Sequence, residues 1–85
     1  MTAEQIRAKL EKVTGQKATY SYEEKEVMGY SCKIHTYRLP TIKVELDHDF
    51  ITGKIIYIVY YRDMNLDTKV RRFRSPSAVG RFLKA

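Results

Sequence analysis

The sequence predicts an α+β fold, with a helix at each end of the chain and four or five mainly antiparallel strands between them. Apolar residues recur at helical spacing only near the two termini, whereas the middle of the chain has the apolar–polar alternation of strands. The 85 residues correspond to a single domain over residues 1–85. We expect both helices to cover one face of the sheet and the other face to stay partly wet.

The first helix is expected to begin after Thr2 and to end at Gly15. Thr2 is a favourable N-cap residue, and Gln5 three positions later completes the pattern of a capping box. Glycine commonly ends a helix because it adopts the left-handed backbone conformation without strain. The apolar stripe of this helix consists of Ile6, Leu10 and Val13.

Five segments have the alternation or the apolar composition of strands: residues 18–23, 29–39, 41–47, 54–62 and 68–73. Between the third and the fourth, the run from Asp47 to Gly53 predicts a hairpin loop. The fourth segment is apolar on both faces, which is typical of a strand inside the sheet. In the last segment Val70 and Phe73 differ in parity, so we expect a bulge or an early strand end between them.

The second helix is expected to begin at Pro76. Ser75 is a strong N-cap residue, and proline suits the first helical position because the N–H that it lacks has no helical partner there. The apolar face of this helix consists of Ala78, Val79, Phe82 and Leu83.

The composition indicates a soluble, cytoplasmic protein that has no membrane partner. No apolar run approaches the roughly 20 residues that span a bilayer, and the N-terminus lacks the basic and apolar regions of a signal peptide. The single Cys32 cannot form an internal disulfide, which agrees with a reducing compartment.

No set of residues predicts catalysis, and we expect no enzyme, cofactor, metal or small-molecule substrate. The four glycines are scattered and form no phosphate-binding loop. Cys32 and His35, three apart on a strand, point to opposite faces, so Cys32 is expected to be a small core residue. The run Asp47-His48-Asp49 could supply metal ligands together with His35, but it lacks a second cluster and is expected to be a solvated turn.

The placement of charge is the strongest functional signal in the chain. The net charge is +6, and residues 1–68 contain ten basic and ten acidic side chains. The whole excess therefore lies in the last seventeen residues, which have six cations and no acid. Arginine forms bidentate contacts to phosphate and guanine, and the start of the second helix offers backbone amides to an anion. The predicted nucleic-acid-binding residues are Lys69, Arg71, Arg72, Arg74, Ser75, Arg81 and Lys84.

Tyrosines supply a second, weaker signal. Tyr57 and Tyr61 share one face of the apolar fourth strand. Two interpretations are open: the rings pack the sheet, which is the commoner role, or they form an exposed face that stacks nucleic-acid bases. The solvent exposure of these two rings distinguishes the interpretations.

The C-terminal segments resemble the second half of methyl-CpG-binding-type domains. The resemblance spans residues 59–83, about 25 residues, and rests on Val59-Tyr60-Tyr61, on Arg71-Arg72-Phe73-Arg74-Ser75 and on residues 78–83. It implies a small DNA-binding fold in which Arg74 contacts bases, Arg71 and Arg72 flank it, and Phe73 and Phe82 are core residues. The chain has no tryptophan and a longer 62–70 loop than the family's tight turn, and both features depart from that pattern.

We therefore predict a basic nucleic-acid-binding module, with DNA favoured over RNA. The alternative is a phage- or mobile-element-type accessory protein that binds an acidic protein partner. That alternative rests on the two-faced strand from Ile55 to Tyr61, which would need further cover, for example from a second copy in a homodimer.

Overall fold

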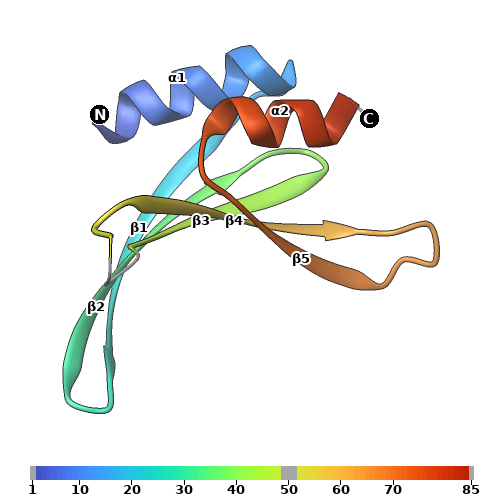
Figure 1. Cartoon of the computed structure of the whole chain (residues 1–85). Helices are drawn as coiled ribbons and strands as arrows, with labels where there is room; N and C mark the ends of the chain where they lie inside the picture. Colours follow the sequence, from blue (N-terminus) through green and yellow to red (C-terminus); the bar gives the residue numbers. More distant parts are fainter. Residues whose placement is uncertain (1, 49–51, 85) are drawn as a thin grey trace.

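The computed structural model describes residues 2–48 and 52–84 and confirms the α+β fold (Figure 1). Among the described residues, no helix is long and apolar enough to span a membrane. The helices and strands are α1 (Ala3–Thr14), β1 (Thr19–Val27), β2 (Tyr30–Arg38), β3 (Ile42–His48), β4 (Ile55–Arg62), β5 (Thr68–Phe73) and α2 (Pro76–Lys84).

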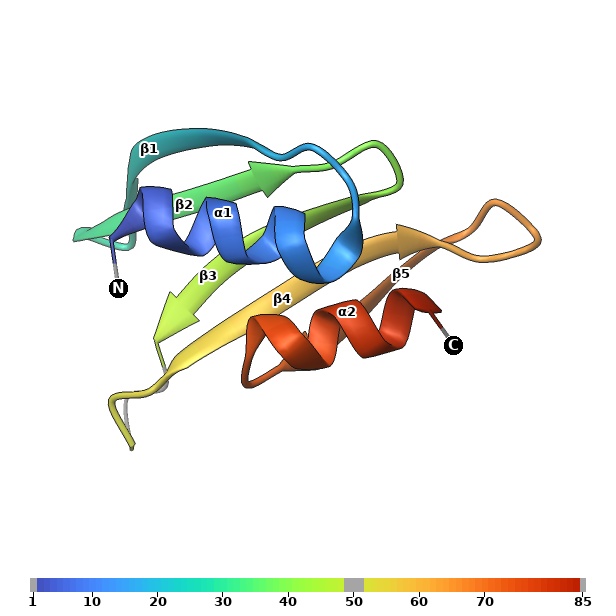
Figure 2. The ribbon, with the colours of Figure 1, turned by 90° about the horizontal axis from the view of Figure 1, so that it is seen from above.

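The five strands form one antiparallel sheet in the order of the sequence, β1-β2-β3-β4-β5. Both helices lie side by side on the same face of this sheet, as the sequence predicts (Figure 2). The β1–β2 and β4–β5 hairpins extend in different directions beyond the helices (Figure 1). We call the face under the helices the helix side and the opposite face the open side.

Both helices begin, and α1 also ends, as their cap residues predict. In α1 the Thr2 hydroxyl accepts the Gln5 N–H at 3.1 Å, and the Gln5 side chain accepts the Thr2 N–H at 2.8 Å, which completes the capping box. Gly15 ends the helix with a φ of 70° and donates its N–H to the Glu11 carbonyl. At the start of α2 the Ser75 hydroxyl accepts the Ala78 N–H at 3.2 Å.

The core lies between the sheet and the two helices. Ile42 and Val44 of β3 are buried on the helix side, and Lys43 and Glu45 alternate with them on the open side, as predicted. The fully buried side chains come from α1, β2, β3, β4 and α2: Leu10, Tyr37, Val44, Val59 and Val79. The core therefore ties both helices to the three interior strands.

Two expectations about the strands are wrong. The first strand does not stop near Glu23 but continues to Val27, because residues 19–27 pair in full with β2 across a two-residue turn at Met28-Gly29, where both φ angles are positive. The last strand contains no bulge: its pairing with β4 runs without interruption from Thr68 to Phe73. Val70 simply lies on the open side and is 47% exposed.

Cys32 is also not the core residue that the sequence predicts. It is partly exposed on the open side of β2, because its parity matches Ile34 and the helices cover the other face. The prediction that Cys32 and His35 face opposite ways agrees with the strand register. The predicted 47–53 loop begins too early, because Asp47 and His48 still pair with Ile56 and Ile55 in β3. Residues 49–51 of that loop lie outside the described residues.

Tyr37 gives the fold an expected dependence on alkaline pH. Its side chain is fully buried, its hydroxyl donates to the Ala3 carbonyl at 3.1 Å, and burial raises its pKa to about 12. Because the pKa in an unfolded chain is about 10, ionisation favours unfolding. The stability that the neutral hydroxyl provides is therefore complete below pH ~10 and is lost as pH rises toward ~12.

The chain has seven tyrosines and no tryptophan, so tyrosinate absorbance reports this titration directly. We expect a tyrosinate step at about pH 12 that belongs to Tyr37, or ionisation of Tyr37 together with the loss of far-ultraviolet circular dichroism. The Tyr37→Phe variant should lack that step. Full ionisation near pH 10 in a chain that stays folded would contradict the prediction.

Candidate nucleic-acid interface

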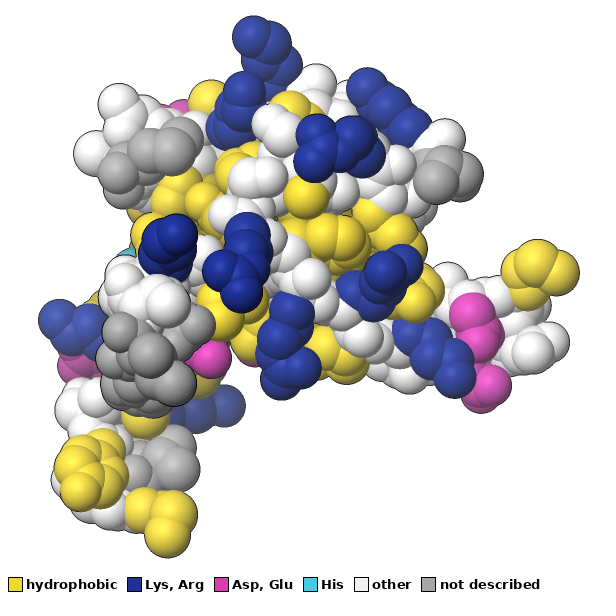
Figure 3. Space-filling view, in the orientation of Figure 1, with side chains coloured by type: hydrophobic (Ala, Val, Ile, Leu, Met, Phe, Trp, Pro, Cys, Tyr) yellow, Lys and Arg dark blue, Asp and Glu magenta, His cyan; other side chains and the backbone are white. Residues whose placement is uncertain are grey.

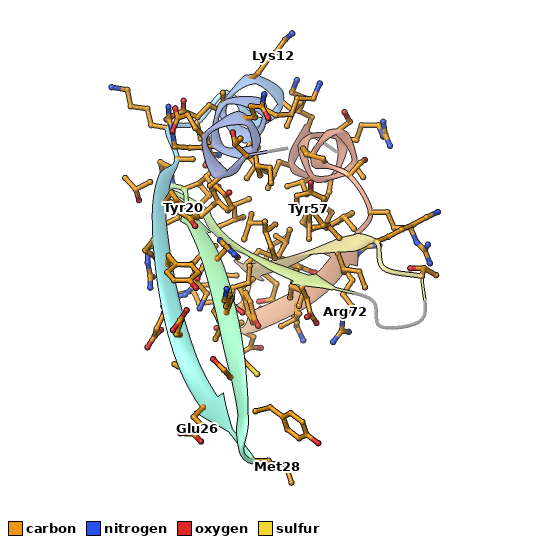
Figure 4. All side chains as sticks on the ribbon, turned by 90° about the vertical axis from the view of Figure 1, so that its left-hand side faces the viewer. Lys12, Tyr20, Glu26, Met28, Tyr57 and Arg72 are labelled. Atoms are coloured by element: carbon orange, nitrogen blue, oxygen red, sulfur yellow. The ribbon has the colours of Figure 1, made fainter. Side chains whose placement is uncertain are left out.

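β5 is an edge strand, and its arginines lie on both faces of the sheet. Arg71 pairs with Val59 in the β4–β5 register and shares the helix side with it, whereas Arg72 pairs with Ile58 on the open side. Figure 4 shows Tyr57 between the sheet and the helices and Arg72 on the opposite side of the sheet. Every residue from Thr68 to Arg72 is exposed. The arginines that are adjacent in the sequence therefore point to opposite faces of the sheet, because side chains alternate along a strand.

On the helix side, Arg71 lies against an aromatic cluster. Its guanidinium carbon is 5.7 Å from the ring centroid of Phe73 and 5.1 Å from that of Phe82 in α2. Phe82 in turn contacts Tyr61 edge-on, with ring centroids 4.9 Å apart. A guanidinium over an aromatic face gains about 0.5–1 kcal/mol at an exposed site. The aromatic cluster therefore favours one position of the Arg71 side chain.

On the open side, Arg72 adjoins a network of polar groups around Tyr60. The Tyr60 hydroxyl donates to Glu45 at 3.2 Å, and the Lys43 ammonium lies 4.6 Å from the Tyr60 ring centroid and 3.4 Å from Glu45. Burial raises the pKa of Tyr60, the nearby Glu45 raises it further, and Arg72 opposes the effect. Lys43 thus has a carboxylate partner on the open side.

Lys69 differs from the arginines because it adjoins the β4–β5 turn. Its ammonium is 3.9 Å from an Asp63 carboxylate oxygen. The other Asp63 oxygen accepts the N–H groups of Asn65 and Asp67, so Asp63 also holds the turn together. We therefore expect Lys69 to contribute less to anion binding than Arg71, Arg72 and Arg74 do.

α2 continues the basic surface beyond β5. Arg74 is exposed directly before the helix. The hydroxyl of Ser75, which is also among the predicted binding residues, caps the helix by accepting the Ala78 N–H. Arg81 and Lys84 of α2 are also exposed. Together with Lys12 of α1, they line a hollow of about 290 Å³ between the two helices.

Lys12 belongs to this surface, although no pattern in the sequence predicts it. In the sequence it is one of several polar residues on an amphipathic helix, and no local signal distinguishes it. Only the packing of α1 against α2 brings it beside Arg81 and Lys84.

Six cations come from β5, from the segment between β5 and α2, from α2 and from the adjoining end of α1, and we call them together the basic surface: Lys12, Arg71, Arg72, Arg74, Arg81 and Lys84. Within residues 2–48 and 52–84, none of these six has a carboxylate within 4.0 Å. By contrast, Arg7 of α1 pairs with both Glu4 and Glu11. Figure 3 shows Lys and Arg side chains spread across this side of the molecule, with acidic groups mainly at its margins.

The tyrosine alternative is wrong for Tyr57, because that ring is only 5% exposed and packs in the core. Tyr61 is partly exposed, and its ring packs against Phe82. The helix side of β4 is thus covered by the chain's own helices. On the open side, Ile56, Ile58 and Tyr60 remain partly exposed.

The Asp47-His48-Asp49 run is only partly described, since Asp49 and the side chain of His48 lie outside the described residues. Within the described part of the chain, no three His, Cys, Asp or Glu side chains converge as metal ligands do.

Comparison with known proteins shows no relative, so the function has to be inferred from the residues of this chain. No model of a known protein family, no curated protein and no solved structure matches this chain.

Proposed function

We propose that this chain is a nucleic-acid-binding module that contacts its ligand with the basic surface. The observation that carries the proposal is the set of cations on β5 and α2 without carboxylate partners among the described residues. Unpaired cations at close spacing repel one another, and a polyanion relieves that repulsion while releasing its own counterions. DNA is favoured over RNA by the resemblance of the C-terminal segments to methyl-CpG-binding-type domains.

The geometry of β5 suggests how the ligand approaches. Arg71 and Arg72 extend from opposite faces of one exposed edge strand, so a single ligand reaches both only if it meets the edge. The major groove of DNA is about 12 Å wide and admits a two-stranded ribbon. An edge-on approach would bring the side chains of Arg71 and Arg72 into the groove on either side of β5 and leave Arg74 beside a phosphate near the start of α2.

The proposal predicts salt-dependent binding that weakens when arginines of the basic surface are removed. We expect Arg72→Ala/Arg74→Ala to lower the affinity for a fluorescein-labelled 20-base-pair duplex by about tenfold at physiological salt. The slope of log K against log salt should fall by roughly two, since each lost phosphate contact removes about 0.9. Fluorescence anisotropy over a series of salt concentrations measures both quantities, with single-stranded DNA and RNA as parallel ligands.

The matched control is Lys25→Ala/Lys33→Ala, which removes the same charge from the β1–β2 hairpin. Both lysines are exposed and far in the sheet order from β5. We expect this variant to keep the wild-type salt slope. Equal losses in the two variants would show a net-charge effect rather than a site, and wild-type affinity in the arginine variant would refute the interface.

The open edge of β5 supports a second candidate, binding of an acidic protein strand by an accessory protein of phage or mobile-element type. An edge strand offers unpaired backbone groups to another chain, and its cations favour an acidic partner. The partly exposed apolar groups on the open side, Ile56, Ile58 and Tyr60, could supply further contacts or a dimer interface. Absence of nucleic-acid binding at low salt, together with binding of an acidic extended peptide, would favour this candidate.

A further inference from the structure

We infer that Arg71 determines base specificity, by contacting a guanine edge with a guanidinium held in place by Phe73 and Phe82. This inference rests on the proposed function. It differs from the expectation drawn from the family resemblance, in which Arg74 has that role. The rest of the basic surface then supplies phosphate contacts that are independent of sequence.

Arg71 differs from the other described arginines in its contact with aromatic rings. The Arg71 guanidinium carbon lies over two aromatic rings, at 5.1 and 5.7 Å from their centroids. No other arginine among the described residues has such a contact. Arg71 also has no carboxylate within 4.0 Å in the described chain, so its N–H groups are not engaged by an acid.

The aromatic cluster itself is anchored in the fold. Phe73 and Phe82 contact each other with centroids 5.3 Å apart, and Phe82 contacts Tyr61 of β4 at 4.9 Å. Phe73 and Tyr61 also pack against the buried core. The surface against which Arg71 lies is therefore formed by β4, β5 and α2 together, and it is as rigid as these elements.

The chemistry of guanine recognition fits such a side chain. A bidentate contact to O6 and N7 needs two parallel N–H donors in the plane of the base pair, and the planar guanidinium supplies them. A side chain that is already positioned loses less conformational entropy when it binds. Lysine would keep the charge but not the pair of fixed donors, which makes Arg71→Lys the informative substitution.

The test selects duplexes from a randomised pool with the wild-type protein and compares affinities for the selected duplex and for one with guanine replaced. We expect the wild type to enrich guanine at one position and Arg71→Lys to lose at least tenfold of the discrimination there. The salt slope of Arg71→Lys should stay at the wild-type value. Phe82→Leu keeps an apolar side chain but removes one ring, so it should lose part of the discrimination.

Two further variants separate a specific role from a general one. Arg72→Lys should change the affinity for both duplexes by the same factor, and Arg38→Lys on β2 should behave as the wild type. Urea unfolding of each variant excludes loss of the fold as the cause.

Wild-type discrimination in Arg71→Lys would overturn the inference. So would binding by the wild type without any enriched sequence, although that result leaves the proposed function intact. Absence of all duplex binding at low salt would overturn both.

Discussion

The Leu10→Ala variant is expected to lose about 2–5 kcal/mol of unfolding free energy, the range for truncation of a buried leucine. Leu10 is fully buried and comes from the middle of α1. Its removal deletes core contacts and leaves a cavity between the helix and the sheet. A domain of this size has a small margin, typically ~5 kcal/mol at the low end, so the variant should be close to unfolding at room temperature.

Urea unfolding followed by far-ultraviolet circular dichroism measures the loss. The control is Lys12→Ala in the same helix, where the side chain is exposed and alanine is a good helix former. We expect the control to stay within about 0.5 kcal/mol of the wild type. A Leu10→Ala loss below 1 kcal/mol would contradict the packing of α1 described above.

The Gly80→Leu variant is expected to lose stability at the upper end of the roughly 1–3 kcal/mol that overpacking costs. Gly80 is buried where α2 crosses α1, and a Cβ there would lie 2.6 Å from the Val13 carbonyl oxygen and 2.8 Å from the Val13 Cβ. Both contacts are too short, and a backbone oxygen cannot rotate away. The two helices must therefore separate, although leucine has the higher helix propensity.

The same unfolding measurement applies, with Arg81→Ala as the neighbouring control. Arg81 is exposed on the same helix, so its replacement tests α2 without changing the crossing. Gly80→Ala adds a single methyl group and should fall between the control and Gly80→Leu. If Gly80→Leu were as stable as the wild type, the close contact between the helices would be refuted. Reduced nucleic-acid affinity in Gly80→Leu would further indicate that the crossing positions Lys12 beside Arg81.

Local signals in the sequence predicted the ends of helices where a side chain forms a hydrogen bond with the backbone a few residues away. Thr2 and Gln5 form a capping box and Ser75 caps α2, because these contacts span only three residues. The alternation around Val44 likewise predicted which residues of β3 face inward. By contrast, the polar half of β1 has no such pattern and is a strand only because β2 pairs with it.

The sequence predicted which C-terminal cations belong to the candidate site, but not which of them lie close together in the folded chain. The sequence identified the acid-free C-terminal segment, and the resemblance to methyl-CpG-binding-type domains selected Arg74; both remain predictions about function. The aromatic support of Arg71 depends on Phe82, eleven residues away in another element. Lys12 joins the basic surface from the opposite end of the chain.

The sequence by itself determined the order of the elements, the inward face of β3 and the position of the net charge. These properties follow from the period of the backbone and from contacts between near neighbours. Only the tertiary structure decided which face of the sheet the helices cover, and hence that Tyr57 is buried and Cys32 is not. It also decided which cations lie together. The physical reason is that burial and charge proximity depend on contacts between elements distant in the chain, which no local pattern encodes.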